Sequence, residues 1–490
     1  MKKRNWLKPL AALLLSACLT MPASALDRYD YVLDTDGTTR IPTPLTYRCE
    51  RVLAPFSAAY GTLNQPKAFY ITGDVLFVAD SGNDRVVKMS LDGEILQAFT
   101  EADGKAFSGP AGVFVDDDGD VYVSDTGNHR LVHLNGDGAW VETFVKPESE
   151  MLEEDMIFDI STVRITDGGM IYVLKGQNFM MIDADNTFRG YLGANKVELS
   201  LQYIMMNLFA SEQQKQYMNK PKPAVYNSFT LSEKGMVYAT CEGNSSQLQL
   251  INASGKNIFP ARFYGEMSIS DAGLPELPRF IDIAVNDGSY VAAIEQKSAR
   301  IYLYSSAGDL LTVFGGSGET KGFFDVPAAC TVDRNDNIYV LDSARGEIQV
   351  FTPTTFFQNV LEANRLFIAG DYDKAYDAWN QVYQVDASYP LANSSMAKTL
   401  LKNNRLENAM QMQKLADDKA GYSASFDEWR HLMFRTYFGV VVLAAAVLIT
   451  ALILAFYWLR KRANRILAAY YDGKRGTAVN KPQNNRRRKE

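Results

Sequence analysis

Histidine, cysteine and carboxylate side chains are the groups that could form a catalytic or metal centre in this chain. There are only three histidines, His129, His133 and His431. A catalytic zinc ion needs several such ligands converging on one point. His431 lies beside a long apolar stretch, and His129 and His133 are four residues apart in a strand-like segment. We therefore do not expect a three-histidine metal site.

The sequence also lacks the short motifs that mark common active sites. It contains no G-x-S-x-G, H-E-x-x-H or Walker motif, and no Cys and His arranged as a reactive pair. The acidic run at 116–120, DDDGD, suggests a calcium loop. Alternating apolar residues on both sides indicate instead a turn between two strands. We expect no catalytic residue, no bound metal and no cofactor.

One set of polar residues recurs along the chain at matching positions. The first, second and sixth copies have an Asp at the end of an apolar strand, and the first two continue with Asn and Arg. Two interpretations are open. The Asp could accept turn amides and pair with the Arg, which would fix a corner of the fold, or the Asp and Asn could form a ligand site. The residues are Asp80, Asn83, Arg85, Asp125, Asn128, Arg130 and Asp342.

These polar residues belong to a larger repeat that must position them. Six copies combine alternating apolar residues with Gly-containing turns, and the alternation predicts strands. The copies begin at Ala68, Gly112, Val163, Phe229, Ile283 and Cys330. Copies three to five lack the Asp and have Leu174-Lys175, Thr240-Cys241 and Ile294-Glu295 in its place. The body of the chain is therefore predicted to be mainly β.

Residues 110–130, PAGVFVDDDGDVYVSDTGNHR, resemble the NHL-repeat family. The resemblance implies a six-bladed β-propeller over residues 26–355, with about four strands in each blade. The last copy lacks an outer strand, and we expect Tyr47–Leu53 to supply it and close the ring. Propellers similar to this one include lactonases and lyases. A calcium-dependent enzyme of that type, with the metal held by Asp, Asn and Glu oxygens in the channel, is the alternative function.

An insertion at 197–220 interrupts the repeats between copies three and four. Its apolar residues have helical spacing and predict an amphipathic helix. The helix would either pack against the propeller or dock a partner, since Met-rich surfaces adapt to different shapes. The residues of this candidate partner surface are Leu201, Met205, Leu208 and Phe209.

Residues 356–430 have a different period from the propeller. Gly370, Tyr372, Ala375 and Trp379 resemble the second half of a tetratricopeptide repeat. About two helical hairpins are predicted, and arrays of this type need three or more repeats to be stable alone. We expect this helical stalk to lean on the propeller base or on a partner.

The two ends predict export and a single membrane span. Residues 1–25 have the basic, apolar and A-x-A regions of a signal peptide. Lipidation at Cys18 and an uncut anchor are the alternatives. Residues 437–459 carry no charge and are long enough to cross a bilayer. The tail, 460–490, has eleven basic and two acidic residues, which predicts a cytoplasmic C-terminus. The protein is expected in the cell membrane, with the propeller outside.

Charge and cysteine content narrow the classes of partner. The whole chain has a net charge of -7, yet its tail carries +9 and its first eight residues carry four more positive charges. The body is therefore strongly acidic, which excludes nucleic acid as its partner. Hydrophobic residues make up 47% of the chain, which excludes a disordered protein. After signal cleavage the cysteines are Cys49, Cys241 and Cys330, too few for a disulfide framework.

The combined prediction is a non-enzymatic, membrane-anchored binding or scaffold protein. Its propeller and stalk would hold a protein partner or ligand at the cell surface. Similar anchored NHL-repeat proteins occur in bacteria with sugar-import transporters. That resemblance implies a transporter permease or a solute-binding protein as the partner.

Overall fold

The structure is a computed structural model that describes residues 30–34, 37–176, 178–192, 225–242, 246–270, 273–286, 288–416 and 418–478, the last seven without their side chains. The predicted signal segment, the insertion with Leu201, Met205, Leu208 and Phe209, and most of the tail lie outside the described residues. The chain forms two compact units, Met1–Asn403 and Asn404–Glu490, which are described separately below.

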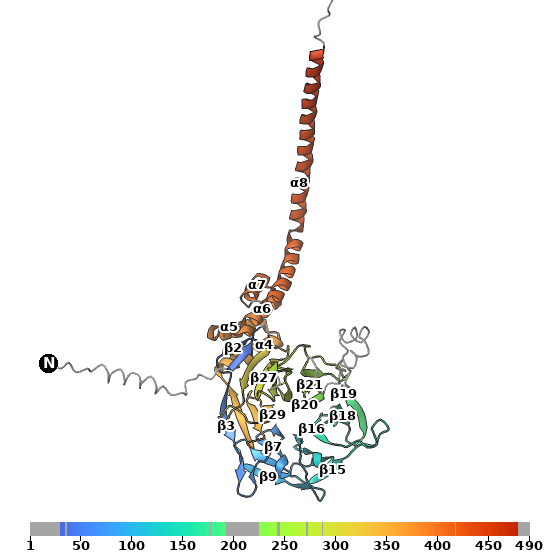
Figure 1. Cartoon of the computed structure of the whole chain (residues 1–490), viewed down its shortest axis with the longest axis vertical. Coiled ribbons are helices and arrows are strands. Elements are labelled where there is room, and N and C mark those ends of the chain that lie inside the picture. Colours follow the sequence, from blue (N-terminus) through green and yellow to red (C-terminus); the bar gives the residue numbers. More distant parts are fainter. Residues whose placement is uncertain are drawn as a thin grey trace, which may run out of the picture. The chain divides into compact units, whose positions relative to one another are not determined.

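The first unit is a six-bladed β-propeller, as the repeats predict (Figure 1). Blades 1 to 3 are four-stranded antiparallel sheets whose strands follow the chain order. Blade 1 contains β6 (Ala68–Thr72), β7 (Val75–Asp80), β8 (Arg85–Ser90) and β9 (Ile95–Phe99). Blade 2 contains β12 (Gly112–Val115), β13 (Val121–Asp125), β14 (Arg130–Leu134) and β15 (Trp140–Phe144). Blade 3 contains β16 (Ile160–Ile165), β17 (Ile171–Lys175), β18 (Asn178–Ile182) and β19 (Phe188–Leu192).

Blade 4 has three strands in the described residues, fewer than the four expected. They are β20 (Val225–Leu231), β21 (Val237–Glu242) and β22 (Leu248–Ile251). The following segment makes only an isolated bridge to β22, at Asn257. The Asn257 side chain accepts the Leu250 and Phe259 amides, and such bonds compete with a regular ladder. Pro260 follows, and it has no amide to donate.

Both ends of the propeller domain build blade 6. It contains β29 (Pro327–Val332), β30 (Ile338–Asp342), β31 (Glu347–Pro353) and the N-terminal strand β3 (Tyr47–Leu53). Strand β3 runs antiparallel to β31, with Cys49 opposite Phe351. The prediction that this strand closes the ring is confirmed.

Blade 5 is wider than the repeat predicts. Its own strands are β25 (Phe280–Asn286), β26 (Tyr290–Glu295), β27 (Arg300–Ser305) and β28 (Leu310–Gly315). An N-terminal hairpin of β1 (Asp30–Leu33) and β2 (Arg40–Thr43) extends the sheet to six strands. The hairpin joins at Tyr31, opposite Val313 of β28. The N-terminal segment thus contributes to two neighbouring blades.

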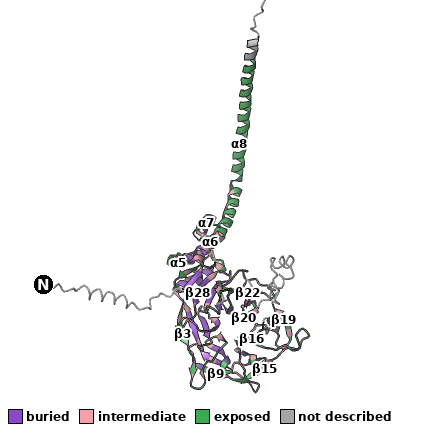
Figure 2. Ribbon diagram, viewed as in Figure 1, coloured by how far each residue is buried: buried purple, intermediate pink, exposed green. Residues whose placement is uncertain are grey.

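The core lies between the blades, where second and third strands are buried on both faces (Figure 2). Leu76 and Val78 of blade 1, for example, pack in one cluster with Tyr339 and Leu341 of blade 6. The close approach of blades 2 and 3 requires Gly112, because a Cβ atom there would lie 2.4 Å from the Ser161 carbonyl oxygen. The propeller therefore rests on apolar burial, and no disulfide joins Cys49, Cys241 and Cys330 to one another.

Strand topology gives the propeller two distinct faces. The turn between the second and third strands, such as Ser81–Asn83, lies on the same face as the entry to the first strand. We call this the motif face. Small hairpins occupy connections there: β4 (Phe56–Ser57) with β5 (Gly61–Thr62), β10 (Glu101–Ala102) with β11 (Lys105–Ala106), and β23 (Ser268–Ile269) with β24 (Pro275–Glu276). The turn between the first and second strands lies on the opposite face.

Three helices pack on that opposite face, which we call the helix face (Figure 1). They are α4 (Thr355–Ala369), α5 (Tyr372–Val385) and α6 (Pro390–Lys402). The Thr354 side chain accepts the Phe357 amide and caps α4, which ends at Gly370 with a φ of 83°. The Asn364 side chain donates to the Ser289 carbonyl, and the Tyr389 hydroxyl donates to the Leu311 carbonyl. The helical segment therefore leans on the propeller, as expected.

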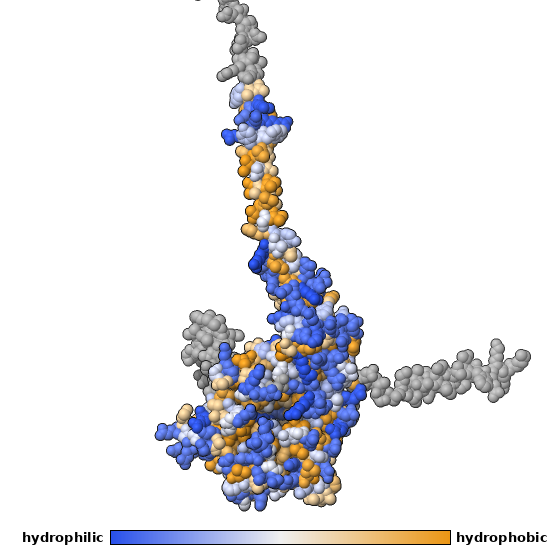
Figure 3. Space-filling model, turned by 180° about the vertical axis from the view of Figure 1, so that it is seen from behind, coloured by the Kyte–Doolittle hydropathy of each residue, from blue (hydrophilic) through white to orange (hydrophobic). Residues whose placement is uncertain are grey.

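The second unit contains α7 (Leu406–Leu415) and α8 (Lys419–Ala478). Helix α8 is continuous over 60 residues, so it includes both the end of the predicted stalk and the predicted span at 437–459. Its most apolar 18-residue window has a mean hydropathy of 2.9 and no buried residue. Figure 3 shows this stretch as an apolar band with polar segments on both sides. The helix is long and apolar enough to cross a membrane.

Candidate functional site

The repeated Asp, Asn and Arg residues meet at one corner of each of the first two blades. One oxygen of Asp80 accepts from Arg85 Nε at 2.7 Å and from Asn83 Nδ2 at 2.8 Å. Its other oxygen accepts the Asn64 amide at 2.7 Å. In blade 2, Asp125 makes the same contacts with Arg130, Asn128 and the Ser108 amide.

Both carboxylates are inaccessible to solvent, and both guanidinium groups are more than nine-tenths buried. A buried ion pair is tolerated only when the remaining donors and acceptors are also satisfied. Arg85 meets this condition by donating to the Tyr60 and Thr62 carbonyls of the connection from blade 6. The corners thus tie neighbouring blades together, and their polar atoms are engaged within the chain. These are the contacts that the structural interpretation of the motif expects.

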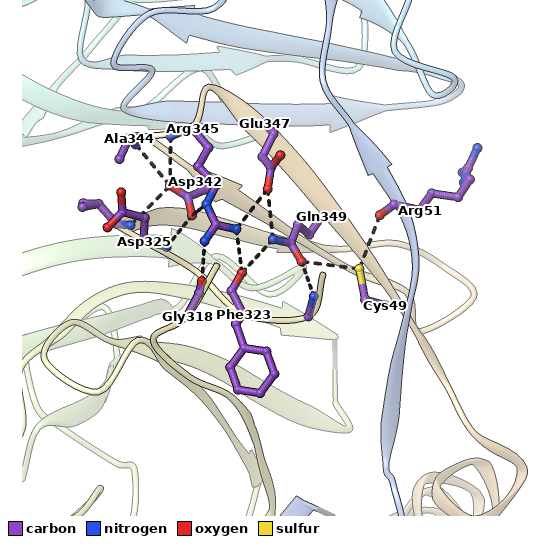
Figure 4. Close-up of polar contacts among 12 residues, drawn as sticks. Cys49, Arg51, Gly318, Phe323, Asp325, Asp342, Ala344, Arg345, Glu347 and Gln349 are labelled. Atoms are coloured by element: carbon purple, nitrogen blue, oxygen red, sulfur yellow. Dashed lines mark hydrogen bonds and ion pairs between the residues drawn. The ribbon is translucent and has the colours of Figure 1, made fainter. Parts of the chain in front are cut away.

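Blade 6 builds the same corner with different residues (Figure 4). Asp342 accepts the Asp325 amide at 2.7 Å and the Ala344 amide at 3.1 Å. Arg345 occupies the place of the motif Asn and donates to the Gly318 and Phe323 carbonyls. Glu347 stands where the motif has Arg, and it accepts from Arg345. An arginine still binds the connection that enters the blade, although this arginine stands at the position of the motif Asn.

Blade 5 also has a carboxylate at this corner. Comparison of the six repeat copies did not reveal it, because the residue is a Glu and not an Asp. Glu295 lies opposite Arg300, as Asp80 lies opposite Arg85. Its carboxylate accepts the Ser298 amide at 2.7 Å and the Ser298 hydroxyl at 2.6 Å. Arg300 makes no ion pair here and instead lies 5.5 Å from the Tyr31 ring centroid. The longer Glu side chain provides the same type of acceptor and leaves the arginine for another contact.

The inner strands place a second polar group at the centre of the ring. Arg164 of β16 lies 5.7 Å from the Tyr70 ring centroid and 5.9 Å from that of Phe114, so it is held between aromatic side chains of blades 1 and 2. Its Nη1 donates to the Val163 carbonyl, and its Nε has no hydrogen-bond partner among the described residues. Burial lowers the pKa of Arg164.

An acidic group from blade 5 accompanies this arginine. Asp282 of β25 accepts the Ser228 hydroxyl at 2.6 Å and the Cys330 amide at 2.7 Å. Burial raises the pKa of this carboxyl, and the positive charge of Arg164 partly opposes the rise. The only sequence signal for Arg164 is a charged residue in an otherwise uncharged strand, so motif reasoning did not find it.

This central group offers binding chemistry more readily than catalysis. Burial raises the pKa of the Cys330 thiol well above its ordinary range, which disfavours the nucleophilic thiolate. His133 lies apart on β14, between Asp120 and Glu142 at 2.9 and 3.0 Å, and stacks on Tyr122. Within the described ranges, no three His, Cys, Asp or Glu side chains are arranged to hold a metal ion.

Comparison with protein families identifies an NHL repeat at residues 107–134, which include the motif corner of blade 2. The chain thus carries an NHL repeat within a six-bladed propeller. None of the curated proteins matches the chain.

Solved structures with a similar fold share little sequence with this chain. Virginiamycin B lyase from Staphylococcus aureus is 12% identical, with a TM-score of 0.38, over 66% of this chain and 88% of the lyase. An exported protein from Bacteroides fragilis is 12% identical, with a TM-score of 0.41, over 61% and 86%. A protein of unknown function from Bacteroides thetaiotaomicron is 12% identical, with a TM-score of 0.42, over 64% and 80%.

Proposed function

We propose that this protein is a membrane-anchored binding or scaffold protein that holds a protein partner or ligand outside the cell membrane. One observation carries the proposal: helices α4–α6 are attached to the helix face. This helical segment leads along the chain to α8. This joint between the helices and the propeller supports a propeller that is held near a membrane.

Polar contacts at this joint link two blades to the helices. Arg365 of α4 donates to both oxygens of Asp336 at 2.6 Å, in the turn between β29 and β30. Asp336 also accepts from Asn286 at 2.6 Å and from the Tyr290 hydroxyl at 3.1 Å, both from blade 5. Both contacts come from one guanidinium nitrogen, Nη2, which lies between the two carboxylate oxygens. Blades 5 and 6 and α4 are therefore joined through one carboxylate.

Charge at the end of the span supports the orientation. Arg460, Lys461 and Arg462 follow the apolar stretch directly, and the tail continues to be basic. Basic residues next to a span favour the cytoplasmic side. We propose that the protein crosses the cell membrane once, with the propeller outside, and that its partner is a membrane or membrane-associated protein such as a transporter permease or a solute-binding protein. The insertion with Met205 and Phe209 remains the candidate partner surface.

Crosslinking in native membranes, followed by identification of the captured proteins, tests this function. We expect one protein to be captured reproducibly with the full chain. The control is a variant in which α8 is kept and residues 30–353, the propeller strands, are deleted, which should lose the partner. Capture of the same protein by the control would show that the propeller is not the binding module.

Metal analysis distinguishes the calcium-dependent lactonase or lyase alternative. The full chain is purified in detergent without chelators, and its calcium content is measured. A stoichiometric calcium ion that survives dialysis would favour the enzyme, and its absence would favour the binding protein.

A further inference from the structure

A pocket of about 600 Å³ lies between the outer parts of blades 5 and 6. Strands β1, β2, β3 and β28 line it, together with the connection at 315–323. Four of its lining residues are basic, and they come from four different segments: Arg40, Arg48, Arg300 and Lys321. The pocket is thus a concentration of positive charge on a strongly acidic protein body.

Two of the four basic residues have no acidic partner in the described part of the chain. Arg40 pairs with Glu266 at 2.7 Å, and Lys321 donates to the Glu50 carbonyl. No carboxylate of the described residues lies within ion-pair distance of Arg48 or Arg300. The body contains many more acidic than basic residues, so a shortage of carboxylates does not explain this arrangement.

The single carboxyl group of the pocket, Asp30, is directed elsewhere. It accepts the Thr46 amide and the Thr46 hydroxyl, each at 2.6 Å. Burial raises the pKa of Asp30 to about 6, which still leaves the carboxyl mostly ionised at neutral pH. Its carboxylate is engaged by Thr46, however, and forms no ion pair with Arg48 or Arg300.

Aromatic and apolar side chains shape the pocket, and the basic residues give it a positive charge. The Tyr31 ring lies 4.6 Å from the Arg40 guanidinium and 5.5 Å from that of Arg300, which positions both groups. Beneath the pocket, Phe314 stacks on Tyr47 with ring centroids 4.7 Å apart, and both rings are buried. The accessible apolar lining comes from Pro42, Leu45 and Phe323. Cationic groups beside an apolar wall suit a ligand with two different ends.

We propose that this pocket binds a small organic anion in which a carboxylate or phosphate group is carried on a flat ring. Guanidinium groups bind carboxylates and phosphates through paired hydrogen bonds, and Arg48 and Arg300 have donors free for this purpose. The ring of the ligand packs on the accessible apolar lining of Pro42, Leu45 and Phe323. This inference deepens the proposed function, because it gives the chemical class of a ligand that the propeller would hold.

Calorimetric titration of the full chain in detergent at low salt tests the proposal. The probes are phenyl phosphate, benzoate, inorganic phosphate and phenol. We expect phenyl phosphate and benzoate to bind, phenyl phosphate about tenfold more tightly than inorganic phosphate, and phenol not to bind, because charge and ring both contribute. Added salt should weaken binding of the anions.

Variants locate the binding to the pocket. Arg48→Gln and Arg300→Gln should each weaken phenyl phosphate binding by about tenfold or more, the effect of losing a charged hydrogen bond. Arg300→Lys should have an intermediate effect, since it keeps the charge and loses the planar fork. The matched control is Arg334→Gln, an exposed arginine in the turn between β29 and β30. Because Arg48 is exposed, Arg48→Gln should keep the fold even if Arg300→Gln does not.

The proposal is wrong if neither phenyl phosphate nor benzoate binds, or if the Arg48→Gln variant binds both as tightly as the wild type. If Arg48→Gln and Arg300→Gln instead abolish partner crosslinking and leave phenyl phosphate binding unchanged, the pocket takes an acidic segment of the partner and the small-anion proposal fails. Titration uses the purified chain alone and does not involve the partner. The small-anion proposal can therefore be wrong while the scaffold function is right, and the scaffold function can be wrong while the anion site is right.

Discussion

At the scale of single residues, buried charges in this propeller are of two kinds. Asp80 and Asp125 have arginine partners, and both oxygens of each carboxylate accept from donors of the chain. Asp30 is buried with neutral donors only. The first kind stabilises the fold when both partners are present, whereas the second costs free energy whenever the carboxyl is ionised. The two kinds should respond differently to substitution and to pH.

Substitution of Asp80 should show that the corner acts as a pair. Asp80→Ala leaves Arg85 buried without a partner and should destabilise the full chain by about 3–5 kcal/mol. The double variant Asp80→Leu with Arg85→Met should lose less, because no uncompensated charge remains. Urea unfolding in detergent followed by tryptophan fluorescence measures both.

The control for this pair is Arg51, whose ion pair with Asp92 at 3.0 Å is exposed. Arg51→Met should change stability by less than about 1 kcal/mol. Equal losses for Asp80→Ala and Arg51→Met would mean that burial of the motif corner has no energetic consequence.

Asp30 should make the stability of the propeller depend on pH in the acidic range. The native pKa of this carboxyl is about 6, against 3.8 in the unfolded chain, so the native state holds the proton more tightly. Stability should therefore fall as pH rises from about 4 to about 6, by up to about 3 kcal/mol, and be level above that range. Asp30→Asn should remove this component. Unfolding free energies of both proteins across pH 4–8 measure it, and parallel profiles would contradict the assignment.

At the scale of elements, the N-terminal segment has two separate tasks. Strand β3 completes blade 6, and the hairpin β1–β2 widens blade 5. Only the first task closes the ring, because the hairpin adds to a blade that already has four strands of its own. The same segment also supplies Arg40 and Arg48 to the pocket between these blades.

Deletion of residues 27–53 should make the protein aggregate or become protease-sensitive, because the edge of β31 would be exposed. Deletion of residues 27–43 is the matched comparison, since it removes the hairpin and keeps β3. We expect this shorter deletion to lower the melting temperature by less and to leave the protein soluble. A melting temperature unchanged by the longer deletion would contradict closure by β3.

At the scale of the whole molecule, a propeller with docked helices is followed along the chain by one long apolar helix. The strongly basic tail beyond it favours the proposed cytoplasmic C-terminus. In that orientation, the function would be restricted to what the propeller meets on the outer side of the membrane. Topology is therefore the first property of the whole chain to establish.

Protease added to intact cells, or to spheroplasts if there is an outer membrane, should remove the propeller and leave an epitope placed after Glu490 protected. Immunoblotting against the epitope measures the outcome, and detergent permeabilisation is the control that should expose it. Digestion of the epitope in intact cells would reverse the proposed orientation.

The sequence by itself determined the repeat, its strands, the closing strand Tyr47–Leu53 and the apolar span. Those features are local, since side chains alternate along a strand and turns need Gly, Asn or Asp at fixed positions. Only the tertiary structure decided that Glu295 and Arg345 serve corners where the motif is absent, and that Arg164 and Asp282 both belong to the central polar group. It alone brought Arg40 to Glu266, 226 residues away, because contacts between blades depend on how distant segments pack.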